Sequence, residues 1–105
     1  MFGLSNAVVN DICNVFKDYS NITEVLIFGS RAKGNYRTGS DIDLVAKGDS
    51  ITFNQLVDIN LKIEDLGLLY KVDVLSYEEK KGTPIGEHID RVAKVFYRNH
   101  ACDEL

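Results

Sequence analysis

The sequence has little that would export the chain, anchor it in a membrane or cross-link it. No apolar run approaches the roughly 20 residues that span a bilayer, and the N-terminus lacks the basic and apolar regions of a signal peptide. We therefore expect a cytoplasmic protein without membrane contact.

The chain has two cysteines, Cys13 and Cys102, near its opposite ends. This placement favours a buried helical thiol and a free tail thiol over a disulfide or metal pair.

Positive charge is also scarce. The 12 Lys and Arg residues are outnumbered by 16 Asp and Glu, which leaves a net charge of −4. Such a chain lacks the broad basic surface that grips long nucleic acid, which argues against a DNA polymerase but not against binding of one nucleotide. The length of 105 residues, without repeats, linkers or low-complexity segments, predicts one domain over residues 1–105.

The sequence shows no nucleophilic serine or cysteine paired with a histidine. His88 adjoins the apolar stripe of a predicted helix, and His100 lies in the C-terminal tail. Neither histidine has a partner at metal-ligand or catalytic-triad spacing, so we assign a catalytic role to neither.

The most informative stretch begins with a tight turn. The apolar run Glu24–Phe28 is typical of a strand, and Gly29 follows it where the chain must turn. Ser30 then offers a hydroxyl and a backbone N–H at the start of a short predicted helix over 30–33. Exposed N–H groups and the positive end of a helix dipole attract phosphate, so this turn is a candidate phosphate site.

Basic and aromatic side chains follow the turn. Arg31 and Lys33 flank it, and each is a candidate for pairing with a triphosphate. Tyr36 and Arg37 lie in a polar loop over 34–39 and are weaker candidates. A loop tyrosine usually neither stacks on a base nor presents a reactive hydroxyl, and a solvated arginine is the more common situation.

Three acidic residues supply the second half of the predicted site. Asp41 and Asp43 lie two apart in a predicted strand over 41–46, so their carboxylates leave one face roughly 7 Å apart. A divalent cation would relieve their repulsion, and Mg²⁺ favours one or two carboxylates together with substrate phosphates. Asp73 lies among apolar residues in a further predicted strand over 71–75. Three acids beside a phosphate-binding turn suit two metal ions about 3.5–4 Å apart and in-line attack on a nucleotide phosphate.

Apolar periodicity predicts the remaining elements. We expect helices over 4–19 and 52–66, the second capped by Asp49 or Ser50, and a solvated loop over 78–82. A last helix opens at Thr83–Pro84, buries Ile85, Ile89 and Val92, and precedes a short edge strand at 95–97. This order of elements predicts an α/β fold whose mixed sheet carries helices mainly on one face.

The spaced pattern Gly29-Ser30, Gly34, Ser40-Asp41-x-Asp43 and Asp73 resembles the DNA polymerase beta-like nucleotidyltransferase superfamily. The short chain resembles its minimal nucleotidyltransferase (MNT) branch, and the likeness runs from about Val25 to Leu75. It implies a palm-like core and Mg²⁺-dependent transfer of a nucleoside monophosphate, with AMP from ATP favoured, to an acceptor hydroxyl with release of pyrophosphate.

The resemblance also implies roles for individual residues. Asp41 and Asp43 would hold both metals, and Asp73 would ligate the metal beside the attacking oxygen. The Gly29–Ser30 turn would hold the terminal phosphates of the nucleotide. Lys33 stands where many relatives carry arginine, which implies a weaker grip on phosphate because lysine lacks the bidentate guanidinium.

The resemblance also bears on the acceptor and the partner. MNT proteins of this size are commonly paired with a small helical HEPN-type ribonuclease as its antitoxin, which implies AMP transfer to a tyrosine of such a partner. Two alternatives stay open: a non-catalytic antitoxin that keeps the motif for nucleotide sensing, and a nucleotidyltransferase for a small molecule such as an aminoglycoside. The intact set of three acids favours an enzyme. The small-molecule enzyme would need a pocket completed by dimerisation, so a homo-oligomer also stays open.

Overall fold

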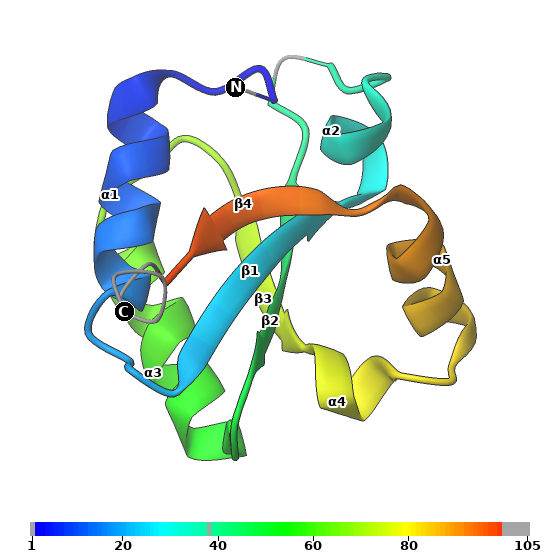
Figure 1. The fold of residues 1–105 in the computed structure, drawn as a ribbon. Coiled ribbons are helices and arrows are strands. Elements are labelled where there is room, and N and C mark those ends of the chain that lie inside the picture. Colours follow the sequence, from blue (N-terminus) through cyan, green and yellow to red (C-terminus); the bar gives the residue numbers. More distant parts are fainter. Residues whose placement is uncertain (1, 38, 100–105) are drawn as a thin grey trace.

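A computed structural model of the protein describes residues 2–37 and 39–99, so that His100 and Cys102 lie outside the described residues. The chain forms a four-stranded sheet in the order β3-β2-β1-β4 (Figure 1). The strands are β1 (Ile22–Phe28), β2 (Ile42–Gly48), β3 (Val72–Ser76) and β4 (Lys94–Arg98). Strand β1 pairs antiparallel with β2 and β4, and β2 pairs parallel with β3. The predicted α/β fold with a mixed sheet is confirmed, and the last strand lies at a sheet edge as predicted.

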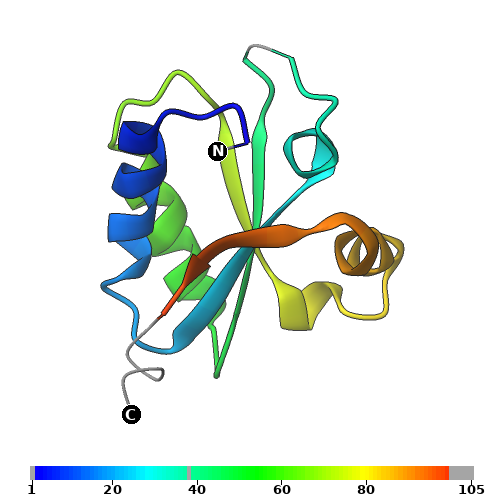
Figure 2. The same cartoon turned by 45° about the horizontal axis from the view of Figure 1, so that its top comes forward.

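The two longest helices, α1 (Asn6–Phe16) and α3 (Phe53–Glu64), cover one face of the sheet (Figure 2). Both begin at a hydroxyl cap, because Ser5 accepts a hydrogen bond from the Val8 amide and Thr52 from the Gln55 amide. The predicted cap of α3 at Asp49 or Ser50 is therefore wrong. The main core lies between these helices and the sheet and includes Ile12, Phe16, Ile22, Val25, Ile27, Ile42, Leu44 and Ile59.

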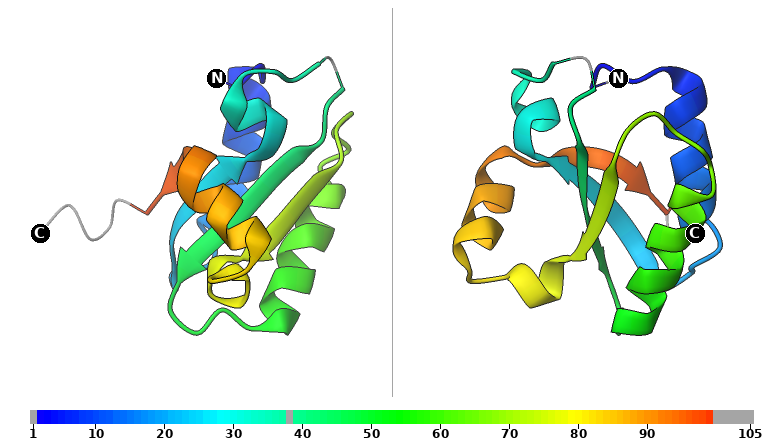
Figure 3. Two further views of the ribbon diagram at one scale, coloured as in Figure 1. Left: turned by 90° about the vertical axis from the view of Figure 1, so that its right-hand side faces the viewer. Right: turned by 180° about the vertical axis from the view of Figure 1, so that it is seen from behind.

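Three shorter helices lie on the other side of the sheet (Figures 2 and 3). They are α2 (Gly29–Lys33), α4 (Tyr77–Lys80) and α5 (Pro84–Val92). The predicted loop over 78–82 is wrong in its first part, which forms the single turn of α4. Ile89 of α5 is buried against Phe28 and Val45 in a second, small core, whereas Ile85 of the predicted stripe is 40% exposed.

Strand β2 shows how the sheet positions the acidic residues. Ile42, Leu44 and Ala46 belong to the main core, and Val45 belongs to the small core on the opposite face. Because side chains alternate along a strand, Asp43 points to the same side as Val45. The predicted alternation along this strand is confirmed, although α5 also buries part of the face that carries the acids.

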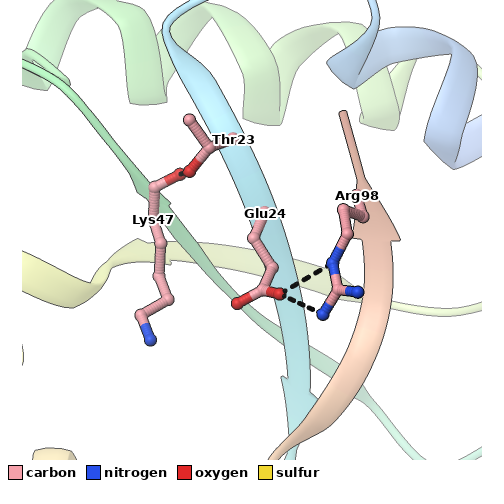
Figure 4. Close-up of polar contacts among 4 residues, drawn as sticks. All are labelled: Thr23, Glu24, Lys47 and Arg98. Carbon is pink, nitrogen blue, oxygen red and sulfur yellow. Dashed lines mark hydrogen bonds and ion pairs between the residues drawn. The ribbon is translucent and has the colours of Figure 1, made fainter. Parts of the chain in front are cut away.

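Strand β4 is attached to β1 by side chains as well as by the backbone (Figure 4). The Arg98 guanidinium pairs with the Glu24 carboxylate at 2.9 Å, and the neighbouring Thr23 hydroxyl donates to the Lys47 carbonyl of β2 at 3.2 Å. Arg98 therefore belongs to the sheet as the last residue of β4. Within residues 2–37 and 39–99, every helix is too short or too polar to cross a bilayer.

Candidate functional site

The predicted turn after β1 is present and brings its backbone against an acidic side chain. Phe28 of β1 is the register partner of Asp43 of β2, and Gly29 then starts α2 with a φ of +71°. A Cβ atom on Gly29 would lie 2.6 Å from Asp43 Oδ2. Glycine is therefore needed here twice, for the left-handed backbone conformation and for the close approach of the carboxylate.

The three predicted acids converge at the same end of the sheet. Asp43 and Asp73 are register partners across the parallel pair β2–β3, and Asp41 directly precedes β2. Asp41 and Asp73 are exposed, whereas Asp43 is half-buried. Partial burial raises the pKa of the Asp43 carboxyl above its ordinary value, and the negative charges of Asp41 and Asp73 raise it further. The carboxylates are therefore close enough to repel one another.

The donor set fits Mg²⁺ by its chemistry. Carboxylate oxygens are the hard ligands that Mg²⁺ prefers, and none of Asp41, Asp43 and Asp73 forms an ion pair within the described residues. In the same part of the chain, no group of three or more acidic, histidine or cysteine side chains is already arranged to hold a metal ion. The protein would thus supply part of the coordination shell, and oxygens of a bound triphosphate would complete it.

The predicted phosphate ligands have different placements. Ser30 is half-exposed in the first turn of α2, and its carbonyl accepts hydrogen bonds from the amides of Gly34 and Asn35. Gly34 ends α2 in the left-handed conformation, and Lys33 is exposed just before it. Ser30 and Lys33 therefore remain accessible to a ligand at the turn.

Arg31 is placed differently, because it is only 3% exposed. Its Nε and Nη2 donate to the Ser40 carbonyl at 3.1 and 2.9 Å, and its Nη1 donates to the Phe2 carbonyl at 2.9 Å. The rings of Tyr36 and Tyr70 lie against the guanidinium. The predicted pairing of Arg31 with a triphosphate conflicts with this placement, since all three guanidinium nitrogens already donate to the backbone.

His88 is a neighbour of the site that sequence reasoning missed. It lies on α5, and its ring packs edge-on against Phe28 with 6.2 Å between ring centroids. It is also close enough to Asp43 for its charge to lower the pKa of that carboxyl. The one available signal was its position next to Ile89, whose apolar character predicted that this part of the helix faces the sheet.

A cavity of about 380 Å³ adjoins the acidic cluster. Asp73 is at its rim, and its other lining residues come from the end of α3 and from the segment that leads into β3. They are Asn60, Ile63, Glu64, Leu68, Tyr70, Lys71 and Val72. The acid on β3 thus borders both the other carboxylates and a space large enough for a side chain of a second molecule.

Solved structures with this fold include toxin–antitoxin complexes. A crystal structure of a toxin–antitoxin with AMP-PNP matches at 20% identity and a TM-score of 0.69, over 91% of this chain and 77% of that chain. A complex of tri-AMPylated Shewanella oneidensis HEPN toxin with MNT antitoxin matches at 17% identity and a TM-score of 0.67, over 96% and 78%. A putative nucleotidyltransferase from Sulfolobus solfataricus matches at 22% identity and a TM-score of 0.55, over 94% of both chains.

At these identities the solved structures support the fold. Curated proteins give no match to this sequence. The family described as polymerase beta, nucleotidyltransferase, in contrast, matches residues 10–101, a range that contains the turn at Gly29 and all three acids. The chain therefore belongs to the polymerase beta nucleotidyltransferase family.

Proposed function

We propose that this protein is a Mg²⁺-dependent nucleotidyltransferase of the MNT type that transfers AMP from ATP to an acceptor hydroxyl. The observation that carries the proposal is the close approach of Asp43 to the turn at Gly29. The Asp43 carboxylate lies against the backbone of Gly29, and Asp43 is the register partner of Asp73. A triphosphate at this turn would therefore have carboxylates beside it to hold its cations.

Each residue has a role in this proposal. The Ser30 hydroxyl and the turn at Gly29 bind the terminal phosphates, and Lys33 adds positive charge from the exposed end of α2. Asp41, Asp43 and Asp73 would hold Mg²⁺. When bound, Mg²⁺ supplies positive charge that stabilises the attacking and leaving oxygens.

The exposed Asp73 carboxylate is the proposed proton acceptor. It takes the proton of the acceptor hydroxyl while that oxygen forms a bond to the α-phosphorus. The bond between the α-phosphorus and the bridging oxygen then breaks, and pyrophosphate leaves. The acceptor side chain approaches from the cavity that Asp73 borders.

The proposed acceptor is a tyrosine hydroxyl of a small helical HEPN-type partner, so that the chain acts as an antitoxin. Support comes from the similar structures, which include a complex of MNT antitoxin with tri-AMPylated HEPN toxin and a toxin–antitoxin with AMP-PNP. The chain itself supports the proposal by its intact set of three acids, Asp41, Asp43 and Asp73. An antitoxin that acts only by contact would not need them.

The test combines the purified protein, ATP labelled at the α-phosphate, Mg²⁺ and the product of the neighbouring gene as the candidate partner. We expect label on the partner with the wild type and none with Asp43→Asn. Asp58→Asn is a matched control, since Asp58 is an exposed acid on α3 that pairs with Lys62 at 3.5 Å. Tight complex formation without label would support the non-catalytic antitoxin instead, and label on an aminoglycoside alone would support the small-molecule enzyme.

A further inference from the structure

Arg31 is a buried cation that no acid of the described residues pairs with. Of the charged side chains in the described residues, it is the one that is buried, and none of the acids in that part of the chain forms an ion pair with it. Burying a charge is costly unless hydrogen bonds and favourable electrostatics replace its water. The buried guanidinium must therefore be stabilised by the groups that surround it.

Three hydrogen bonds and two aromatic rings replace water around the guanidinium. Nε and Nη2 share the Ser40 carbonyl in a two-pronged contact, and Nη1 donates to the Phe2 carbonyl. Arg31 Cζ lies 5.2 Å from the centroid of the Tyr36 ring and 4.9 Å from that of Tyr70. Aromatic faces attract a cation, so the two rings compensate part of the lost hydration.

Hydrogen bonds fix the peptide units on both sides of Asp41, and Arg31 makes those on one side. Arg31 holds the carbonyl of Ser40, immediately before Asp41, and the Ile42 amide immediately after it donates to the Lys71 carbonyl at 2.8 Å. Arg31 itself follows Ser30 in α2. The side chain therefore ties the phosphate-binding turn to the backbone that carries the first acid.

The N-terminal segment closes over this arrangement. Gly3 has a φ of +74°, and a Cβ on it would overlap the ring of Tyr36. The backbone of Gly3 thus packs directly on the ring that covers Arg31. Phe2, whose carbonyl accepts from Arg31, also stacks on Phe96 of β4 with 6.4 Å between ring centroids. Residues far apart in the sequence meet at the guanidinium.

We infer that Arg31 is a positioning residue that orients Asp41 for metal binding and does not touch the nucleotide. It acts through the Ser40 carbonyl, and the Tyr36 ring with the Phe2–Gly3 segment keeps it in place. The inference rests on the proposed function in one respect, that Asp41 holds a divalent cation. Groups that orient metal ligands from outside the coordination shell commonly change metal affinity about 10–100-fold when mutated.

The first test measures the binding of Mn²⁺ to the protein by electron paramagnetic resonance, in the absence of nucleotide. Mn²⁺ serves here as a spectroscopic substitute for Mg²⁺. We expect Arg31→Gln to weaken Mn²⁺ binding about 10–100-fold. We also expect Arg31→Lys to weaken it, because lysine cannot hold one carbonyl with two N–H groups. Lys47→Gln is the matched control, since it removes another cation from an aromatic ring, Tyr77, and should leave the Mn²⁺ affinity unchanged.

A second pair of variants keeps Arg31 and changes only its cover. Tyr36→Leu removes the aromatic face and should weaken Mn²⁺ binding, whereas Tyr36→Phe keeps the ring and should retain it. Amide hydrogen exchange at Ile42 in the metal-free protein gives an independent reading, and we expect faster exchange in Arg31→Gln than in Lys47→Gln. If Arg31→Gln does not fold, the comparison of Tyr36→Leu with Tyr36→Phe still tests the inference.

The outcomes separate this inference from the proposed function. A folded Arg31→Gln that binds Mn²⁺ as the wild type does, and whose defect is confined to a raised KM for ATP, would overturn the inference, because Arg31 would then contact the nucleotide. A wild type without detectable Mn²⁺ binding would overturn it as well. A wild type that binds Mn²⁺ through Arg31-dependent positioning but transfers no AMP would refute only the proposed function.

Discussion

Asn60 of α3 pairs with the backbone of Val74 in the edge strand β3. The Val74 amide donates to Asn60 Oδ1 at 3.1 Å, and Asn60 Nδ2 donates to the Val74 carbonyl at 3.3 Å. One side chain thus satisfies both backbone groups of a residue at the open edge of the sheet. Because Asp73 is the preceding residue, the same contact holds the third acid of the site in register.

The first prediction concerns this contact. Asn60→Leu leaves the Val74 amide and carbonyl without their partner, and an unsatisfied buried polar group costs about 1–3 kcal/mol. We expect a fall of this size in the free energy of unfolding, measured with urea. Asn54→Leu is the control, because Asn54 is exposed on the same helix. Equal stability losses in the two variants would show that the Asn60 contact contributes nothing specific.

The second prediction concerns Gly29. Alanine at a left-handed position costs roughly 1–2 kcal/mol, so Gly29→Ala and Gly67→Ala should lose similar stability. Gly67 has a φ of +69° with nothing within 4 Å of an added Cβ, whereas the Cβ at Gly29 would displace the Asp43 carboxylate. We therefore expect AMP transfer to be lost in Gly29→Ala alone. Equal activity in the two variants would argue against a catalytic position for Asp43.

The third prediction concerns the pH dependence of stability. Burial and the charges of Asp41 and Asp73 raise the pKa of Asp43 in the folded protein above its ordinary value of 3.8. As the pH rises from 3.8 through this raised pKa, the unfolded chain releases its proton first, so metal-free wild type loses stability.

Asp43→Asn carries no such proton. Its stability relative to wild type should therefore increase across this window and stay constant above it, as measured by urea unfolding at each pH. A difference that does not change with pH would contradict the electrostatic coupling of the three acids. Asp58→Asn serves as the comparison, because the pKa of Asp58 is shifted in the opposite direction. It is lowered, and the hydrogen bond from Tyr19 is the largest cause.

The fourth prediction concerns His88. Its charge lowers the pKa of Asp43, while its ring packs on Phe28. His88→Phe keeps an aromatic ring in that place and removes the charge, so the pKa of Asp43 should rise. Carbon-detected NMR titration of the Asp43 carboxyl measures this directly. Arg91→Gln, on the same helix, is the control and should leave that pKa unchanged, because Arg91 has no part in the shift of Asp43.

The sequence predicted the features of the site that depend on local order along the chain. Gly29 follows a strand that could be recognised from its apolar run, and the alternation around Asp43 fixed which side of β2 carries the acid. Register across the parallel pair β2–β3, which the structure shows, then brings Asp43 opposite Asp73.

The remaining features depend on contacts between distant segments. Arg31 follows the turn at Gly29, and nothing local shows that Phe2, Ser40 and Tyr70 enclose it. His88 reaches the site because α5 crosses the second face of the sheet, where sequence analysis expected few helices. The cap of α3 is an exception, because Thr52 lies three residues before Gln55, which is the local spacing of a capping box.

The central position of β1 has a consequence for biosynthesis. Its partner on one side, β2, follows it closely in the chain, but its partner on the other side is β4, which begins only at Lys94. During translation, one row of hydrogen-bonding groups on β1 therefore stays open until almost the whole described chain has left the ribosome. An open strand edge of this kind can pair with another nascent chain, and the pairing with β4 closes this edge of β1.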